Sequence, residues 1–383
     1  MVLTVGGNWA EVTYRTNNLP TGEVDVRAYG ADPTGASDST TAIQAAINGL
    51  PSGNLDDTNV TGTLIFPAGR YWITGTLLLK NGIHIRGAGR DASVITNSNN
   101  GVSIFKDVAD TQTGAYLVKF SDISLAYQDY GTTGAGIEIV NNPSNGPRLI
   151  LENVTIHNPY DGVSIANSQF NKWSNVRVVG ALRDGFHSTG SCNALNATAC
   201  SSWGAARHGW YFFGANELSL ISCFAETSTK DGFHFGDSST NSITAATLIS
   251  LGSEANGANN YYLNSARSVS FLSCYAAAIG TETNNWMLAG CQGVTLQNVR
   301  GTYNINVPAF SVYVTTNELG TNTSGLSIIA PYELLGGTAE VNNTNGVYRT
   351  DSRSGKHYFG KTLIDSDVNR LEFLSTDGGL SGR

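Results

Sequence analysis

The chain has 383 residues, with 44 glycines, only 9 prolines, 14% charged residues and a net charge of −8. The negative charge and the absence of clustered lysines and arginines argue against a nucleic-acid partner. No run approaches about 18 apolar residues, and residues 1–10 lack a basic region followed by an apolar core, so we expect neither a membrane span nor a secretory signal.

The N-terminal part of the chain carries four short blocks in order. They are residues 24–32 (VDVRAYGAD), 38–47 (DSTTAIQAAI), 66–71 (FPAGRY) and 85–89 (IRGAG). In the second block, capping residues precede Ala42, Ile43, Ala46 and Ile47 at helical spacing, which predicts a helix over residues 38–48. We expect this helix to cover the first rung of a stacked fold, because an uncovered edge recruits other chains.

From residue 161 onward, one short segment recurs seven times. The pattern Asp-Gly-Phe-His at Asp184 and Asp231 has looser counterparts that begin at residues 161, 208, 259, 284 and 308. The second positions of these segments are 23, 24, 23, 28, 25 and 24 residues apart. Each unit is too short to bury its own apolar face, so a repeat of this period indicates a solenoid.

The residues that follow the second position alternate in character, which in a strand sends them to opposite faces. The pattern predicts two inward ladders and one outward row between them. The first ladder is Val163, Phe186, Trp210, Phe233, Tyr261, Trp286 and Phe310; the second is Ile165, Ser188, Phe212, Phe235, Leu263, Leu288 and Val312; the outward row is Ser164, His187, Tyr211, His234, Tyr262, Met287 and Ser311. We therefore predict an all-β, right-handed parallel β-helix (solenoid) with an N-terminal capping helix.

A second strand is predicted ahead of each repeated segment. Its inward residues are Val176, Cys200, Cys223, Leu251 and Cys274, with Thr198, Ile221, Ile249 and Leu272 two residues earlier. This prediction puts three of the five cysteines into one buried stack, where cysteine behaves as a small hydrophobe.

The repeat divides the chain into three regions. Residues 1–23 are predicted to be an N-terminal attachment segment, residues 24–350 the parallel β-helix, and residues 351–383 a C-terminal tail in which the repeat fails. The tail is too small to form its own core, so we expect it to be disordered or ordered by packing against other subunits.

The four N-terminal blocks, in this order, resemble the pectate-lyase-like superfamily in its phage tailspike and polysaccharide depolymerase branch. The resemblance covers about residues 24–95, and the repeats support it to about residue 345. It implies a homotrimer on a virion tail, made in the host cytoplasm, with bacterial capsule or lipopolysaccharide as ligand. With only about 23 residues before the first block, attachment to a tail or adaptor protein through a short N-terminal peptide is implied.

The register also predicts where chemistry occurs. Trp203, Glu226 and Glu254 each lie three residues beyond an inward residue of the second strand, so they share one corner of three successive coils. Two glutamates on neighbouring rungs would be roughly 5–8 Å apart, as in glycosidases, and their pKa values would separate into one acid and one base or nucleophile. We predict Glu226 and Glu254 as the catalytic pair, Asp231 as a helper, and Trp203 with Tyr211 as a sugar platform.

A second polar column, Asp184, His208 and Asp231, precedes the repeated strand, where aspartate before glycine also suits a tight turn. From this column and the adjacent outward row we predict Arg207, His208, Tyr211 and His234 to bind substrate; the aromatic row could equally be a subunit interface. His84, His157 and His357 stand apart from other ligand residues, so no metal and no cofactor is predicted.

Three functions remain open from the sequence. The first is a depolymerase that hydrolyses a bacterial surface glycan with the glutamate pair. The second is a polysaccharide lyase acting on a uronic-acid glycan through His208, Tyr211 and Arg207, with a base and a cation to stabilise the enolate. The third is a receptor-binding fibre without catalysis.

Overall fold

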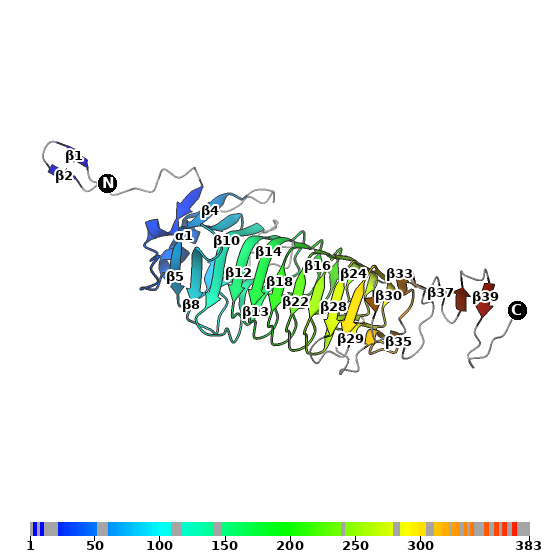
Figure 1. Ribbon diagram of the computed structural model, residues 1–383. Helices are drawn as coiled ribbons and strands as arrows, with labels where there is room; N and C mark the ends of the chain where they lie inside the picture. Colours follow the sequence, from blue (N-terminus) through cyan, green and yellow to red (C-terminus); the bar gives the residue numbers. More distant parts are fainter. Residues whose placement is uncertain are drawn as a thin grey trace.

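The computed structural model describes residues 22–51, 60–108, 117–140, 148–238, 242–278, 284–303, 310–321 and 323–329, together with short strands nearer the two ends of the chain. The chain winds into an elongated solenoid in which parallel strands stack coil upon coil (Figure 1). The predicted all-β parallel β-helix with one short N-terminal helix is confirmed. Among the described residues, no helix has the length and hydrophobicity needed to cross a bilayer.

The strands form three faces. The first face contains β3 (Glu23–Asp25), β4 (Gly62–Phe66), β7 (Ile83–Gly87), the first halves of β10 (Leu117–Tyr127), β12 (Arg148–His157) and β14 (Lys172–Val179), then β17 (Asn196–Thr198), β21 (Ser219–Ile221), β24 (Thr244–Ile249), β27 (Arg267–Leu272), β30 (Gln292–Gln297), β33 (Ser327–Ile329) and β36 (Tyr348–Asp351). The second face contains β5 (Gly69–Ile73), β8 (Ser93–Asn97), the second halves of β10, β12 and β14, then β18 (Ser201–Trp203), β22 (Phe224–Glu226), β25 (Gly252–Glu254), β28 (Tyr275–Ala278), β31 (Arg300–Tyr303) and β34 (Glu333–Leu334).

The third face is an 11-stranded sheet that holds the repeated segment. Its strands are β6 (Leu77–Leu79), β9 (Phe105–Asp107), β11 (Ala135–Ile139), β13 (Asp161–Ala166), β15 (Phe186–Thr189), β19 (Trp210–Phe212), β23 (Phe233–Phe235), β26 (Asn259–Asn264), β29 (Asn284–Ala289), β32 (Phe310–Thr315) and β35 (Thr338–Glu340). Two short strands, β16 (Cys192–Asn193) and β20 (Ala215–Asn216), lie between the third and first faces of their coils.

Between the first and second faces, the chain turns at a single residue with left-handed backbone. The φ angles at this corner lie between 51° and 56° at Asp122, Asn153, Asn175, Ala199, Ser222, Ser250, Ser273 and Asn298. This bend corrects the expectation that Thr198, Ile221, Ile249 and Leu272 continue the inward pattern of the second strand. Because the corner residue breaks the alternation, these four side chains reach solvent while Ala197, Leu220, Leu248 and Phe271 are buried in their place.

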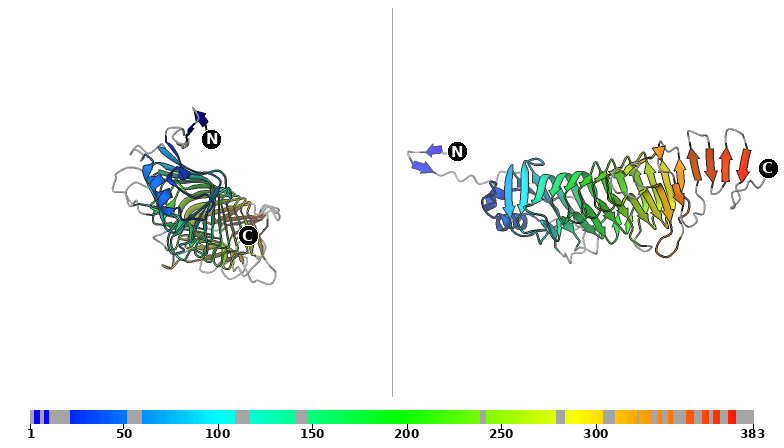
Figure 2. Two further views of the ribbon diagram at one scale, coloured as in Figure 1. Left: turned by 90° about the vertical axis from the view of Figure 1, so that its left-hand side faces the viewer. Right: turned by 60° about the horizontal axis from the view of Figure 1, so that its bottom comes forward.

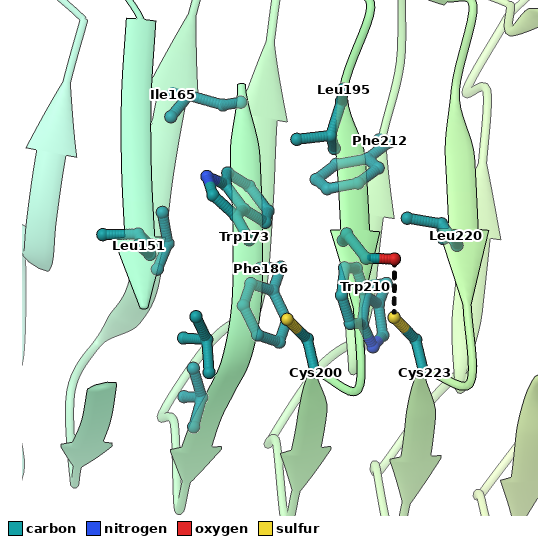
Figure 3. Packing of buried hydrophobic residues seen from close by; sticks show 14 of the residues in the cluster. Leu151, Ile165, Trp173, Phe186, Leu195, Cys200, Trp210, Phe212, Leu220 and Cys223 are labelled. Atoms are coloured by element: carbon teal, nitrogen blue, oxygen red, sulfur yellow. Dashed lines mark hydrogen bonds between the residues drawn. The ribbon is translucent and has the colours of Figure 1, made fainter. Parts of the chain in front are cut away.

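The first predicted inward ladder forms a continuous aromatic stack in the core. Phe186, Trp210, Phe233, Tyr261 and Trp286 are each 0% exposed. Their ring centroids follow one another at 3.9, 5.6, 5.2 and 5.3 Å with near-parallel planes. Figure 3 shows the start of this stack beside Trp173. Apolar and aromatic burial of this kind is the main source of stability in each coil.

The last repeat is two residues out of the predicted register. β32 pairs Val312, not Phe310, with Trp286, while Phe310 pairs with Asn284. Tyr313 therefore pairs with Met287, in the position that the predicted register assigned to Ser311. This repeat begins Pro308-Ala309, whereas the earlier repeats begin with a polar residue followed by glycine or asparagine, so the pattern lacked the pair that aligns the earlier coils.

The cysteines pack as hydrophobes, as the sequence predicted. All five are buried and unbridged, and Cys200 and Cys223 stand on successive coils (Figure 3). The Cys223 thiol donates to the Ala197 carbonyl at 3.5 Å. Burial raises the pKa of Cys274 and Cys291 to about 12, so these thiols stay protonated and unreactive.

Helix α1 (Thr40–Gly49) covers the first coil beside the short 3-10 helix η1 (Val26–Tyr29) (Figure 1). Ile43, Ala46 and Ile47 are buried against the core. The Gln44 side chain accepts from the Leu78 N–H at 2.7 Å and donates to the Leu78 carbonyl at 3.1 Å. These bonds occupy part of the outer edge of β6, the terminal strand of the third face.

The two ends of the chain hold antiparallel strands (Figure 2). β1 (Leu3–Val5) pairs with β2 (Asn8–Ala10), and after β36 the strands β37 (Lys356–Phe359), β38 (Thr362–Asp365) and β39 (Arg370–Phe373) follow one another in antiparallel order. The remaining residues of the predicted attachment segment 1–23 and tail 351–383 lie largely outside the described residues.

The aromatic stack yields a stability prediction. Trp210→Ala should lower the free energy of unfolding by about 3–5 kcal/mol, because it removes a fully buried ring from the middle of the stack. Trp203→Ala is the matched control on the same coil: its side chain is 46% exposed, and a change within about 0.5 kcal/mol is expected. Guanidinium denaturation followed by circular dichroism measures both, and equal losses would contradict the assignment of the core.

Candidate active site

Three of the predicted site residues lie side by side on the second face, each as the last residue of its strand. Strand pairing sets Trp203 of β18 beside Glu226 of β22, and Glu226 beside Glu254 of β25. The intervening residues Ala225 and Ser253 are buried, so the two glutamates point outward. Directly paired residues on neighbouring parallel strands are about 4.8 Å apart at the backbone.

The two carboxylates influence each other. Partial burial, and then the charge of Glu226, raise the pKa of Glu254. Two carboxylates in such proximity repel each other when both are ionised, which favours protonation of Glu254. A protonated and an ionised carboxyl side by side can act as acid and nucleophile.

Aromatic side chains flank the pair on the same face. Trp203 is 46% exposed, and Phe224 lies two residues before Glu226 in β22. A Cβ atom at Gly252 would stand 2.3 Å from the Phe224 ring, so glycine is what lets this ring reach across to the next coil. Tyr275 follows Gly252 in register. We call Trp203, Phe224, Glu226, Glu254 and Tyr275 the carboxylate surface.

Phe224 and Tyr275 were not among the residues predicted for this surface. The signal was available, since both occupy the strand position two residues before the Glu226 column. The guanidinium of Arg300, one coil further, lies 5.7 Å from the Tyr275 ring centroid. Flat apolar faces next to carboxylates are the chemistry that binds and positions sugar rings.

The other predicted residues gather at the start of the third face, after the turn that follows the carboxylate surface. Here a buried ladder runs from coil to coil through Asp161, Asp184, His208, Asp231 and Asn259. Arginines from the preceding corner neutralise its first two carboxylates. Arg183 binds both oxygens of Asp161, and Arg207 binds both oxygens of Asp184, its Nε at 2.9 Å.

Asp184 also bonds the outward row. His187 Nδ1 is 2.7 Å from Asp184 Oδ2. Although burial disfavours its charge, hydrogen bonds from Arg207 and His187 hold the pKa of Asp184 well below its usual range. Asp184 is therefore a permanently ionised, fully bound group at neutral pH.

The outward row forms a second stack over this ladder. Tyr211 lies between the rings of His187, at 5.2 Å, and His234, at 5.0 Å, and Tyr262 follows His234 at 4.5 Å. Arg207 covers the Tyr211 ring at 4.3 Å. Burial raises the pKa of Tyr211 to about 12. The side chains of the outward row therefore contact mainly one another and Arg207.

Asp231 belongs to this second group. Its Oδ1 accepts from the backbone N–H and side-chain amide of Asn259, and its Oδ2 faces His208 and His234. The structure therefore divides the eight predicted residues into two sets. Trp203, Glu226 and Glu254 form one; Arg207, His208, Tyr211, Asp231 and His234 form the other.

The three isolated histidines behave differently. His84 Nε2 is 2.8 Å from Ser121 Oγ on the first face. His157 lies on the second face, in the strand column that leads through Val179 to Trp203. The side chain of His357 is outside the described part of the chain.

Comparisons with known proteins agree with this architecture. Residues 23–119 match the sequence model of a family described as rhamnogalacturonase A/epimerase, pectate lyase-like. This range contains all four N-terminal blocks, and it confirms the resemblance to the pectate-lyase-like superfamily. No curated protein matches the chain significantly.

Solved structures share the fold at low sequence identity. The A-module of a mannuronan C-5 epimerase from Azotobacter vinelandii matches with a TM-score of 0.56 and 16% identity, over 84% of this chain and 98% of that one. The Dettilon tailspike protein gives 0.57 and 12%, over 89% and 77%. A tailspike of an Acinetobacter phage gives 0.57 and 13%, over 95% and 67%.

The buried ladder generates a pH-dependent prediction. Arg207→Met should lower the free energy of unfolding at pH 7 by about 3 kcal/mol, the lower end of the range for a broken buried ion pair. The loss stays at this end because Asp184 loses its guanidinium partner but keeps His187. The pKa of Asp184, depressed in the wild type, should rise in the variant, so the difference in stability should shrink as the pH falls toward 4. Urea denaturation at pH 7 and pH 4 measures this.

Lys230→Met is the control for that experiment. Lys230 occupies the same corner position one coil further, where the ladder residue it would meet is His208 and not a carboxylate. Its loss should change stability by no more than about 0.5 kcal/mol. A difference for Arg207→Met that stays constant between the two pH values would exclude Asp184 as the group responsible.

Proposed function

We propose that this chain is a tailspike-like protein that binds a bacterial surface polysaccharide, capsule or lipopolysaccharide, and cleaves its glycosidic bonds by hydrolysis. The observation that carries the proposal is the pairing of Glu226 with Glu254 on adjacent coils, next to the exposed ring of Trp203. The fold shared with two phage tailspikes supports the choice of substrate class.

The two glutamates take different roles in this mechanism. Glu254, whose pKa is raised by burial and by Glu226, is the better suited of the two to act as the general acid on the leaving oxygen. Glu226 attacks the anomeric carbon as the nucleophile while the glycosidic bond breaks, which gives a glycosyl-enzyme; water deprotonated by Glu254 then hydrolyses this ester and releases Glu226. Adjacent strands are about 4.8 Å apart. This spacing is close to the separation between the two catalytic carboxyl groups of retaining glycosidases, which is about 5–5.5 Å. Trp203 and Phe224 bind the faces of neighbouring sugar rings.

Hydrolysis is preferred over the lyase reaction for reasons found in the second group of residues. A lyase needs a base and a free cation next to the uronate. The Arg207 guanidinium is already engaged, because its edge binds Asp184 and its face covers the Tyr211 ring. A tyrosine with a pKa of about 12 is also a poor base near neutrality.

The same proposal includes assembly. A homotrimer on a virion tail, attached to a tail or adaptor protein through residues 1–23, fits the fold shared with phage tailspikes. Asp231, predicted as a catalytic helper, has no step in this mechanism, because its Oδ1 is held by Asn259 and its Oδ2 by His234.

Glutamine substitutions test the catalytic pair. Glu226→Gln and Glu254→Gln should each reduce the release of reducing ends from a cleaved capsule or lipopolysaccharide by about 10²- to 10⁴-fold, since each removes one proton-transfer or nucleophilic group. Glu217→Gln, an exposed glutamate at a different corner, should keep full activity. Full activity in both test variants would refute the assignment, and binding by the wild type without any shortening of the polymer would favour a receptor-binding fibre.

The stereochemistry of the product tests the mechanism separately. Proton NMR during hydrolysis should show that the first-formed sugar keeps the anomeric configuration of the substrate, as expected for directly adjacent carboxyls. Net inversion would mean that water, not Glu226, attacks the anomeric carbon. Products carrying an unsaturated, ultraviolet-absorbing uronate would instead identify a lyase.

A further inference from the structure

The buried ladder contains a break in its charge pairing. Asp161 and Asp184 each receive a backbone N–H from the next coil at 3.2 Å and a guanidinium from Arg183 or Arg207. Asp231 receives the equivalent N–H from Asn259 at 3.0 Å. The corner residue that would supply its guanidinium is Ala258. The third buried carboxylate of the ladder therefore has two histidines where the others have an arginine.

Those histidines converge on one oxygen. His234 Nδ1 lies 2.8 Å from Asp231 Oδ2, and His208 Nδ1 lies 3.2 Å from the same atom. The other oxygen, Oδ1, is held by the N–H and the side-chain amide of Asn259 at 3.0 and 2.8 Å. The carboxylate is thus fixed on one side and faces two ring nitrogens on the other.

One of those nitrogens has conflicting contacts. His208 Nδ1 accepts a hydrogen bond from the Asp231 backbone N–H at 3.2 Å. A ring nitrogen that accepts this bond carries a lone pair and no proton, so it cannot also donate to Asp231 Oδ2. That lone pair points at the Asp231 N–H, so His208 does not donate to Asp231 Oδ2, 3.2 Å away, and His234 is the imidazole that bonds this oxygen. A cation held by His208 Nδ1 and Asp231 Oδ2 would take the place of the N–H bond and would compensate the buried negative charge.

We propose that His208, Asp231 and His234 bind a divalent transition-metal ion, zinc being the best match, through Nδ1, Oδ2 and Nδ1. The three donor groups lie within 4.8 Å of one another. Imidazole nitrogen and carboxylate oxygen bind Zn²⁺ at about 2.0–2.2 Å, and three protein ligands leave a fourth position for water. Asn259 would orient the carboxylate from behind, as outer hydrogen-bond partners do in metal sites.

The site is shallow enough to load from solvent. The side chains of His208 and Asp231 are 6% and 7% exposed, and that of His234 is 15% exposed. The ligands come from two successive coils, because His208 pairs with Asp231 in the ladder and His234 follows Asp231 by three residues. A bound ion would join those coils and would not need the carboxylate surface.

The neighbouring group Asp161, Asp184 and His187 shows what excludes a metal. Its donor atoms also lie within 4.8 Å of one another. However, Arg183 and Arg207 already neutralise its two carboxylates, and a second cation there would be repelled. The neighbouring group therefore contains the same residue types, but the negative charges of its carboxylates are already compensated.

Zinc titration of the full-length protein tests the site. After dialysis against EDTA, calorimetric titration with ZnCl₂ near neutral pH should give one ion per chain. His208→Gln and His234→Gln should each bind at least about tenfold more weakly, since even loss of an outer hydrogen-bond partner costs about 10- to 100-fold in metal affinity. The control His187→Gln, from the neighbouring group, should bind like the wild type. Zinc should raise the Tm of the wild type and of His187→Gln only.

The alternative outcomes are decisive. Absence of saturable uptake, unchanged affinity in both His208 and His234 variants, or an equal loss in His187→Gln would each overturn the proposal. If the two variants fail to fold by circular dichroism, X-ray absorption of the zinc-loaded wild type decides: two imidazole ligands with oxygen ligands support the site, and sulfur ligands or fewer than two imidazoles refute it.

Discussion

The structure depends on one constraint: every residue in a coil lies directly above the equivalent residue of the next coil, about 4.8 Å away. Aromatic side chains can stack at this spacing, and the aromatic stack from Phe186 to Trp286 is the result. Charges do not, because like charges in direct register repel. Asp161 above Asp184 is tolerated only with Arg183 and Arg207 between the coils. Where Glu226 lies beside Glu254, burial and then the charge of Glu226 raise the pKa of Glu254, which is why this pair indicates chemistry more than stability.

Much of the fold and the core of the candidate site could be predicted from the sequence, because the repeat supplies the register. Glycine at the second position of the repeat aligned the coils, and strand alternation then set Trp203, Glu226 and Glu254 side by side. The prediction failed at Phe310, whose repeat begins Pro-Ala where the earlier repeats have a polar residue followed by glycine or asparagine. It also failed at the corner formed by residues such as Ala199 and Ser222, which adopt left-handed backbone without the glycine that usually signals it.

The grouping of polar residues was harder to predict, because it depends on side-chain partners and not on register. Asp231 is only five residues from Glu226, yet its oxygens are bound by Asn259 of the next coil and by His234 of its own strand. Two copies of the same Asp-Gly-Phe-His segment also differ in their surroundings: Arg207 neutralises Asp184, and Ala258 leaves Asp231 to the histidines. Identical local sequence thus yields different chemistry, decided by one corner residue on the following coil.

The amide of Gln44 bears on a different question, that of chain growth. A stack of parallel coils is chemically a one-dimensional polymer, and its first strand presents the same peptide groups that template addition in amyloid. By matching the N–H and carbonyl of Leu78, Gln44 imitates the peptide group of an incoming strand. Gln44 therefore caps this position of the edge strand, so the Leu78 peptide groups are not free to pair with a strand of another molecule.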